Sequence, residues 1–373
     1  MTTFIDIHAL QTLPPSNINR DDTGSPKSAF FGGVQRQRVS SQAWKSVIRR
    51  DFESHLDRSK LGVRTRLVAD KVVARILELA PEFDAEKAEA AVVAAFKAAG
   101  ITLKKPKAKE GEEAGRPVSG YLILLSNQQI DKLVQAIVEA NGEKLPAKQV
   151  KKILDTNHSV DIALFGRMLA EAADFNVDAA CQVAHALSVH SSEPDFDYYT
   201  AVDDVVRSSD DTTGAGMIGT IEMAASTFYR YANINLDALN ANLGDTSASV
   251  EATLAFVRAF INSMPTGKQN SFAARTLPDA VIVTVRNDRP ISYVNAFEKA
   301  ITEVEGRRVA AARALASEAK SIEEAYGYEP VASYVLALGD LKEELAALGD
   351  SVTLKGLLES LEAQLTALTS QES

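Results

Sequence analysis

Residues 18–50 read INRDDTGSPKSAFFGGVQRQRVSSQAWKSVIRR, a polar stretch that changes from a loop into a helix. Residues 19–27 hold Asp, Gly, Ser and Pro, which predicts a loop that carries charged side chains. A glycine pair at 32–33 gives the backbone freedom, and Gln then alternates with Arg over residues 34–39. From Ser40 onward the spacing of apolar residues is helical. The stretch therefore predicts a loop and a run of cations that lead into a helix start.

This helix start predicts an anion site. Ser40 and Ser41 are hydroxyl residues of the kind that cap helices. Ser41, Lys45 and Arg49 are spaced four residues apart and share one helix face, while Trp44 belongs to an adjoining, mostly apolar stripe. Free N–H groups, the positive end of the helix dipole, the hydroxyls and the two cations can all address a phosphate oxygen. The alternative is an ordinary solvated helix face.

Charge is distributed unevenly along the chain. Residues 1–50 hold seven basic and three acidic residues, a net charge of +4, in a protein whose net charge is −10. Arg36 and Arg38 belong to this basic segment and lead into the same predicted site. Residues 318–373 hold eleven acidic and three basic residues, a net charge of −8. A basic and an acidic end suit an anionic ligand, and they also suit head-to-tail self-association.

The composition predicts a globular protein with more than one subdomain, because 46% of its 373 residues are hydrophobic and 24% are charged. The single cysteine, Cys181, cannot form an internal disulfide or a zinc cluster, which fits a reducing compartment. The N-terminus shows no signal-peptide pattern, and no apolar run approaches the roughly 20 residues that span a bilayer. We expect a cytoplasmic protein with no membrane partner.

The pattern of elements predicts an α+β protein. Alternating apolar residues indicate a first strand over residues 4–10, which Pro14 and Pro15 are expected to end. Residues 56–157 read as helical, around a charged segment, 104–117, that predicts a mobile loop. The pattern also predicts helices at 65–80, 84–99, 127–140, 147–156, 291–303, 306–324, 340–348 and 353–368, strands at 160–168, 228–236, 279–286 and 332–338, a strand or short helix at 176–190, and a hairpin-like excursion at 191–220 with a flexible tip.

The sequence offers binding groups but no assembled catalytic set. Asp21 and Asp22, beside Arg20, leave open a divalent-metal ribonuclease, although no motif supplies a third carboxylate. His185 and His190 invite a metal site, but on a helix their five-residue spacing would turn the rings about 140° apart. We therefore expect no enzymatic activity, no metal and no cofactor.

Seven short motifs are spread over most of the chain. They read FIDIHAL (4–10), NRDD (19–22), FGGVQRQRVSSQ (31–42), VDIALFGRM (160–168), YTAVDD (199–204), FYRYANINL (228–236) and, as a weaker match, NAFEKA (295–300). Together and in this order they resemble the family of the large backbone subunit of type I-E CRISPR Cascade complexes, which coats the spacer part of the guide RNA. Residues 56–155 and the region beyond about 305 match that family only in general character.

The resemblance implies a hand-shaped α+β architecture. Its palm is similar to an RNA-recognition motif, which is a ferredoxin-like fold, and would comprise residues 1–55, 156–190 and 228–373. A helical fingers insertion would cover residues 56–155, and a β-hairpin thumb would cover residues 191–227.

The resemblance also implies which residues contact RNA. Arg167 and Met168 would lie beside a displaced base, and Ile218, near the thumb tip, would wedge against the neighbouring segment. Lys268 and Gln269 look like a further palm contact. The residues implied to lie on the RNA backbone are Asn19, Arg20, Lys27, Ser40, Gln42, Lys45 and Arg49, beside Arg36, Arg38 and Ser41 from the charge and capping arguments.

The function implied is that of a non-catalytic crRNA-binding backbone subunit. Its copies would form a helical filament along the spacer, kink the guide at regular intervals and present it for pairing with target DNA in antiviral defence. Its partners would be crRNA, target DNA by way of the guide, further copies of itself and other Cascade subunits. Two alternatives stay open: a metal ribonuclease that uses Asp21 or Asp22, and a self-associating protein without nucleic acid.

Overall fold

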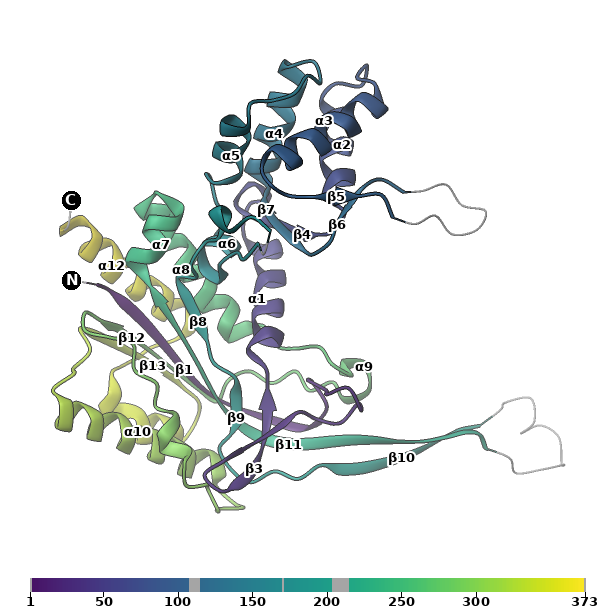
Figure 1. Cartoon of the computed structure of the whole chain (residues 1–373). Helices are drawn as coiled ribbons and strands as arrows, with labels where there is room; N and C mark the ends of the chain where they lie inside the picture. The colour runs from purple at the N-terminus through teal and green to yellow at the C-terminus, as the bar shows by residue number, and fades with distance from the viewer. Residues whose placement is uncertain (1, 107–114, 170, 203–214, 372–373) are drawn as a thin grey trace. The chain divides into compact units, whose positions relative to one another are not determined.

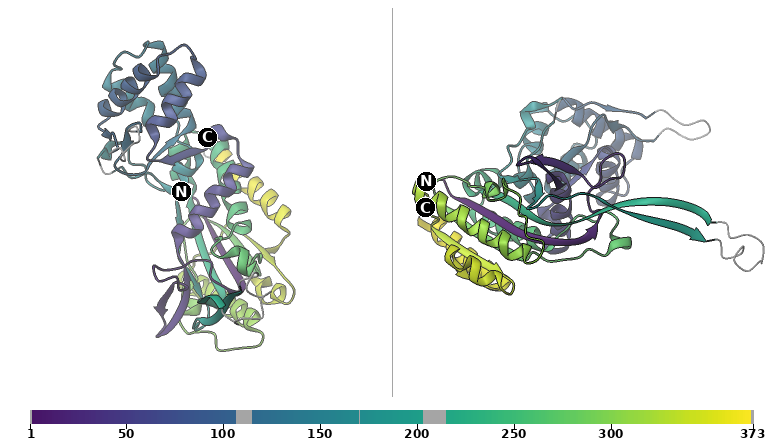
Figure 2. Two further views of the ribbon diagram at one scale, coloured as in Figure 1. Left: turned by 90° about the vertical axis from the view of Figure 1, so that its right-hand side faces the viewer. Right: turned by 90° about the horizontal axis from the view of Figure 1, so that it is seen from below.

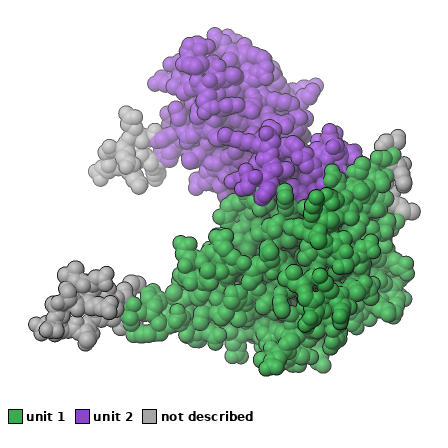
Figure 3. Space-filling view, turned by 180° about the vertical axis from the view of Figure 1, so that it is seen from behind, with its two compact units in different colours: residues 1–51, 183–233, 256–373 green, residues 52–182, 234–255 purple. Residues whose placement is uncertain are grey.

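The computed structural model describes residues 2–106, 115–169, 171–202 and 215–371. The chain divides into two compact units, which Figure 3 colours separately. Unit 1 comprises residues 1–51, 183–233 and 256–373, and unit 2 comprises residues 52–182 and 234–255. Within the described ranges, no helix combines the length and the apolar character that crossing a bilayer requires.

Unit 1 is built on a mixed sheet in which segments far apart in sequence are neighbours (Figure 1). Its strand order is β14-β13-β12-β1-β11-β9-β3-β2, and β8 and β10 also pair with β11. The bounds are β1 (Phe4–Ser16), β2 (Ser28–Phe31), β3 (Val34–Val39), β8 (Cys181–Val183), β9 (Ala186–Ser188), β10 (Asp195–Val202), β11 (Ala215–Asn235), β12 (Ala280–Arg286), β13 (Ala332–Ala337) and β14 (Asp350–Ser351).

The centre of the sheet confirms two predicted strands, residues 4–10, predicted from their alternation, and residues 279–286, predicted from their apolar character. β1 and β12 pair antiparallel from Phe4 opposite Arg286 to Leu10 opposite Ala280. The prediction that Pro14 and Pro15 end the first strand is wrong, because β1 continues to Ser16. The prolines lie beyond the ladder with β12, where their missing N–H groups leave no bond of that ladder unmade.

Helices cover both faces of this sheet. On one face, α10 (Arg307–Tyr326) packs Ala311 and Leu315 against a cluster that includes Leu10 and Ile282. On the other face, α1 (Ser41–His55) packs Trp44 and Val47 into a cluster with Phe228. The other helices of unit 1 are α9 (Gln269–Phe272), α11 (Leu341–Leu345) and α12 (Leu354–Gln371), with short 3-10 turns at Val294–Phe297 and Ala346–Leu348.

The hairpin-like excursion expected at 191–220 is present as a two-stranded ribbon. β10 pairs antiparallel with the first part of β11, from Asp195 opposite Met223 to Val202 opposite Ala215. Figure 2 shows that this ribbon projects from the rest of unit 1. The predicted flexible tip falls mainly on residues 203–214, which lie outside the described residues.

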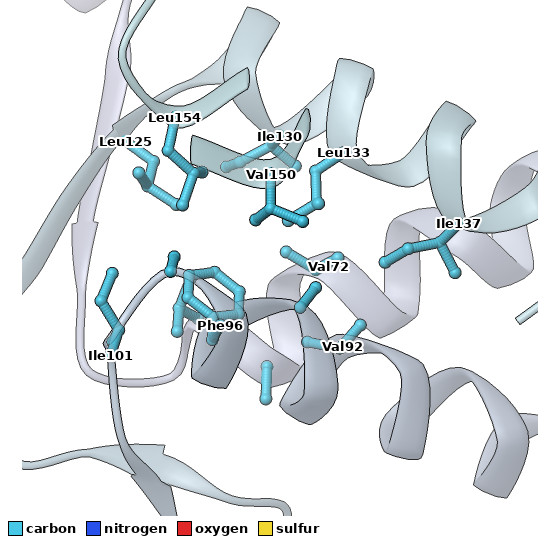
Figure 4. Close-up of a cluster of buried hydrophobic side chains, with 14 of the residues drawn as sticks. Val72, Val92, Phe96, Ile101, Leu125, Ile130, Leu133, Ile137, Val150 and Leu154 are labelled. Atoms are coloured by element: carbon cyan, nitrogen blue, oxygen red, sulfur yellow. The ribbon is translucent and has the colours of Figure 1, made fainter. Parts of the chain in front are cut away.

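Unit 2 confirms the predicted helical block. Its helices surround an apolar core in which Val72, Phe96 and Leu133 meet (Figure 4). Two small strand pairs accompany them, and the predicted mobile loop falls largely on residues 107–114, outside the described residues. The elements are α2 (Val68–Leu79), α3 (Ala85–Ala98), α4 (Asn127–Glu139), α5 (Ala147–Leu154), α6 (Val160–Phe165), α7 (Leu236–Leu243), 3-10 turns at Arg58–Lys60 and Ala173–Phe175, and strands β4 (Gly62–Thr65), β5 (Leu103–Lys104), β6 (Val118–Ser119) and β7 (Ile123–Ser126); α8 (Thr246–Asn262) is shared between the units.

Two element predictions are wrong. Residues 160–168 are not a strand, because residues 160–165 form α6, which is buried on nearly every side and ends at Gly166 with a φ of 77°. A short apolar run of this kind reads alike as a buried strand or a buried helix. Residues 291–303 are not a helix, since several of their backbone N–H groups bond elsewhere: that of Ile291 donates to Asp6 and that of Ile301 to Val189.

Candidate nucleic-acid interface

Helix α1 begins with a cap that joins it to the preceding loop. The Ser40 hydroxyl accepts a hydrogen bond from the Ala43 N–H at 3.3 Å, which is the geometry of a helix N-cap. The Ser40 N–H donates to Asn19 Oδ1 at 2.8 Å. The first turn of α1 contains no acidic residue. The positive end of the helix dipole is therefore not offset by a carboxylate within that turn.

The two faces of α1 differ as the sequence predicts. Trp44 and Ile48 are buried, whereas Ser41, Lys45 and Arg49 are half-buried along the other face. This arrangement follows from the period of the helix, which turns every fourth residue to the same side. The helix thus anchors itself in the core of unit 1 while two cations follow its capped end.

The loop before β2 is fixed by its own hydrogen bonds. Asn17 is buried, and its side-chain amide donates to Gly24 O and Glu222 O, both at 2.9 Å. The Lys27 N–H donates to Asn19 O at 3.0 Å, and Arg20 forms a backbone bridge with Pro26. The Arg20 side chain is exposed at the surface of this closed loop.

The carboxylate of Asp21 serves the same loop. It accepts hydrogen bonds from Thr23 N, Thr23 Oγ1 and Ser25 N at 2.7 to 3.0 Å. These bonds favour the ionised form and lower the pKa of Asp21 below its ordinary value. Asp22 is exposed. Among the described residues, no three His, Cys, Asp or Glu side chains gather closely enough to hold a metal ion.

The segment before α9 lies directly against this loop. A Cβ on Gly267 would come within 2.5 Å of Ile18 O, so only glycine fits there without a shift of the backbone. An open hollow at this contact is lined by residues 18–24 and Gly267. Lys268 is half-buried beside it, whereas Gln269 is buried, with no hydrogen-bond partner for either polar atom of its side-chain amide. The structure thus brings Lys268 close to the Asn19 loop.

Beneath α1 lies a buried cation, Arg230, that was not predicted as a site residue. The Arg230 guanidinium is sandwiched between the Trp44 ring at 3.7 Å and the Phe260 ring at 4.2 Å. It donates to Gln11 Oε1 at 2.6 Å and to the Phe260 carbonyl oxygen. Burial lowers the pKa of Arg230 to about 9, which still leaves it charged near neutral pH.

The two arginines of β3 lie in different environments. Arg36 is fully buried, and its guanidinium donates to the carbonyl oxygens of Phe31, Ser188, Phe297 and Glu298. The expectation that Arg36 contributes to an exposed anion site is therefore wrong, because its donors already bind backbone oxygens. We leave it out of the interface.

Arg38, two residues farther along β3, is half-buried. Its Nη1 lies 3.1 Å from His185 Nδ1, and its N–H donates to the Lys27 carbonyl oxygen. Lys27, Arg38 and His185 therefore form one basic cluster that reaches the Asn19 loop through the bond from Lys27 to Asn19. We call the following exposed or half-buried polar residues of unit 1 the polar face: Asn19, Arg20, Lys27, Arg38, Ser41, Gln42, Lys45, Arg49 and Lys268.

The remaining candidates lie elsewhere. Arg167 belongs to unit 2 and is buried, where it donates to Phe175 O, Leu154 O and Gln129 Oε1, and burial lowers its pKa to about 10. Its neighbour Met168 is 82% exposed. Ile218 lies in β11 opposite Thr200, and its side chain is outside the described part of the chain.

His185 and Arg230 were not predicted as site residues. A local signal existed for His185, since it directly precedes β9, which pairs with the basic strand β3. Arg230 carried a weaker signal: it is a cation in the strongly alternating stretch FYRYANINL, whose two faces both turn out to be buried.

The polar face belongs to an α+β protein in which a capped helix start, a closed loop and several cations belong to one compact unit. The chain belongs to the CT1975-like protein family, whose model matches residues 5–360. It is similar to a chain of a structure described as "CRISPR RNA-guided surveillance complex, pre-nicking", with 38% identity and a TM-score of 0.85, over 97% of this chain and 100% of that one.

A chain of another solved structure, described as "CRISPR RNA-guided surveillance complex", shows 34% identity and a TM-score of 0.73, over 98% of this chain and 99% of that one. No curated protein matches at a significant level. The resemblance to the Cascade backbone family, predicted from seven short motifs, is thereby confirmed.

Proposed function

We propose that this protein is a non-catalytic backbone subunit of a type I-E Cascade complex that binds the crRNA by its phosphates. The observation that carries the proposal is the polar face, where the first turn of α1 is capped by Ser40 and contains no acidic residue. Lys45 and Arg49 follow along one face of the helix, and Arg20 belongs to the loop that Asn19 joins to the cap. Phosphate contacts give affinity without sequence preference, as a scaffold for guides of any sequence requires. The likeness to chains of CRISPR RNA-guided surveillance complexes supports the same function.

In this proposal unit 1 supplies most of a palm, formed by residues 1–55, 156–190 and 228–373. Residues 56–155 are fingers, and the ribbon within 191–227 is a thumb. Several copies stack in the cytoplasm as a helical filament along the spacer, beside other Cascade subunits. Met168 and Ile218 act as apolar wedges that break the base stack at intervals, at a cost of about a few kcal/mol per step that protein contacts offset. The guide is then held ready to pair with target DNA.

A divalent-metal ribonuclease based on Asp21 is less well supported. Its carboxylate already accepts three hydrogen bonds within its own loop. A metal ion would have to compete with these bonds, and catalysis would need further ligands. In a self-associating protein without nucleic acid, the basic region of one copy would pair with the acidic region of another. This alternative gives the capped helix start no ligand.

The test is RNA retention by the purified assembly and its dependence on salt. Lys45→Ala and Arg20→Ala should each weaken retention and lower the slope of log affinity against log salt by about one unit, because each removes one phosphate contact. Lys355→Ala is the matched control, since Lys355 is an exposed lysine on α12, which packs against β13, near the opposite end of the sheet from β3 and β2. An unchanged slope in both variants would remove these residues from the phosphate site.

Two further measurements separate the alternatives. Sequencing of the co-purifying nucleic acid should find repeats joined to variable spacers. A protein-like ratio of absorbance at 260 and 280 nm in the intact assembly would instead favour self-association without nucleic acid. Labelled RNA incubated with the protein and Mg²⁺ should stay intact, and cleavage that Asp21→Asn abolishes would favour the ribonuclease.

A further inference from the structure

His185 lies beside the cap of α1 although no motif selects it. β3 pairs antiparallel with β9, with Arg38 opposite Leu187 and Val39 opposite Ala186. Continuing this register by one residue sets His185 beside Ser40, the capping residue. The His185 side chain is exposed. An imidazole therefore lies at the edge of the polar face.

The contact with Arg38 fixes the state of this imidazole. The distance from His185 Nδ1 to Arg38 Nη1 is 3.1 Å. A guanidinium nitrogen can only donate a hydrogen bond, so Nδ1 must accept and therefore carries no proton. The ring is then the neutral tautomer with its proton on Nε2, which leaves an N–H donor for a further partner. Arg38 is held at the same time, because its Nε donates to the Ser28 carbonyl oxygen.

The charges that face His185 are both positive. Arg38 approaches from β3 and Lys27 from the loop before β2, and among the described residues no carboxylate counts among the groups that shift the pKa of His185. Partial burial and then these two cations lower that pKa. A cluster of two cations and an imidazole is suited to an anion.

We propose that His185 is a further phosphate contact of the guide RNA and that it couples RNA retention to pH. This inference rests on the proposed function, because the anion is a phosphodiester of the same RNA backbone. Near neutral pH the Nε2–H donates to a phosphate oxygen, while Nδ1 orients the Arg38 guanidinium toward the same strand. At lower pH the bound phosphate favours the imidazolium. Its Nδ1 then carries a proton and no longer accepts from Arg38, while the ring adds a third positive charge to the cluster.

The sign of the pH effect follows from linkage. A phosphate near His185 stabilises the protonated ring, so the pKa of His185 is higher in the complex than in the free protein. The complex then takes up a proton that the free protein lacks, and affinity rises as pH falls between those two values. If the pKa of His185 is one unit higher in the complex than in the free protein, affinity can rise by at most tenfold. We therefore expect an increase of about three- to tenfold.

The experiment measures binding of a fluorescent single-stranded oligouridylate to the full chain, freed of co-purified RNA, at pH 8.0 and pH 5.5. The wild type should bind about three- to tenfold more tightly at pH 5.5. His185→Gln should lose most of this gain, because glutamine can make hydrogen bonds but takes up no proton. His55→Gln is the matched control, since His55 is an exposed histidine at the far end of α1 and should leave the gain intact.

Calorimetry gives a second readout that a merely structural role would not move. Titration of the oligouridylate near pH 6 in two buffers of different ionisation enthalpy should detect proton uptake in the wild type and in His55→Gln, but much less in His185→Gln. Equal uptake and an equal pH gain in all three proteins would overturn the role of His185 while leaving the proposed function intact. Absence of RNA binding in the wild type at both pH values would overturn both proposals.

Discussion

Arg286 and Arg230 are both fully buried in unit 1, on opposite faces of one sheet, and they differ in what surrounds their charge. Arg286 has its Nε 3.4 Å from the carboxylate of Asp6, on the face covered by α10. Arg230 lies between the rings of Trp44 and Phe260, on the face covered by α1, and burial alone accounts for the shift of its pKa. One charge is compensated inside the protein, and the other is held by rings and carbonyl oxygens.

The difference matches the role that we propose for each face. On the α10 face, Arg286 donates to the Tyr293 hydroxyl, and Asp6 accepts from the Tyr231 hydroxyl and the Ile291 N–H. Together with the contact between Arg286 and Asp6, these bonds form a closed, buried network. On the α1 face, an uncompensated positive charge lies beneath the first turns of the helix that carries Lys45 and Arg49. The positive electrostatic potential of these three cations favours an anion at the helix start. The comparison can be tested by removing one member of each arrangement at a time.

The largest effect is expected from Asp6→Ala. This change leaves Arg286 buried without its carboxylate, and breaking a buried ion pair from one side costs roughly 3–5 kcal/mol. Urea unfolding followed by Trp44 fluorescence measures the free energy of unfolding, and Trp44 is the only tryptophan of the chain and is buried in unit 1. Asp288→Ala is the control, because Asp288 lies farther from Arg286, at 3.7 Å, and is partly exposed. Equal small losses in both variants would contradict the buried pair.

The next effect concerns pH and arises in the same network. Burial lowers the pKa of His8 to about 3, so below pH 6.5 the unfolded chain binds a proton that the folded protein does not. His8 therefore destabilises the fold as pH falls from 6.5 toward 3. Burial raises the pKa of Asp6 to about 6, so the folded protein keeps a proton that the unfolded chain releases above pH 3.8, and stability is lost as pH rises through 6. Between pH 3.8 and 6 the two slopes oppose each other.

His8→Gln separates these slopes. For each protein, the unfolding free energy at pH 4.5 is compared with its value at pH 7.5. On going to pH 4.5 the variant should lose about 3 kcal/mol less than the wild type, because each pH unit below 6.5 is worth about 1.4 kcal/mol. Urea unfolding at the two pH values gives this double difference, which cancels any constant cost of the new side chain. His55→Gln should show no such gain, and a parallel pH dependence of His8→Gln and the wild type would exclude a buried neutral His8.

The cap of α1 and the contacts of Arg36 show which parts of the site could be predicted from the sequence. The cap of α1 was predictable, because Ser40 and Ala43 are neighbours in sequence and the rule that joins them is local. Arg36 was not, because its partners Ser188 and Phe297 are 152 and 261 residues away. A cation in an alternating strand reads as exposed until the fold supplies its acceptors.

The central strands and the helical block were predicted because their patterns extend over many residues. β1 was predicted from an alternating run and β12 from a continuous apolar run, and the helices of unit 2 repeat an apolar face every turn. The six residues of α6 are too few to separate the two periods, and they were misassigned as a strand. The site was therefore predictable where its geometry is local, at α1, and not where distant strands meet, at His185 and Arg230.

Arg230→Met tests the other half of the comparison. The change removes the charge together with its donors, so no buried charge is left behind, but Gln11 Oε1 and the Phe260 carbonyl oxygen lose hydrogen bonds. At about 1 kcal/mol for each bond, we expect a loss near 2 kcal/mol in urea unfolding followed by circular dichroism. Arg286→Met is the matched variant and should cost more, because it leaves the carboxylate of Asp6 buried and unpaired. Equal losses in the two variants would mean that the arginines are not held differently.

The smallest effect is expected from Ser40→Ala at the helix start. The Ala43 N–H loses its side-chain acceptor, and loss of an N-cap costs about 1 kcal/mol. Ser46→Ala, at an exposed position of the same helix, should leave the unfolding free energy nearly unchanged. Because Ser40→Ala removes no charge, the salt dependence of RNA retention should keep its slope even if retention weakens, in contrast to Lys45→Ala. If the slope falls as much as it does in Lys45→Ala, the cap does more than stabilise the helix end. It then also positions a cation that makes a phosphate contact.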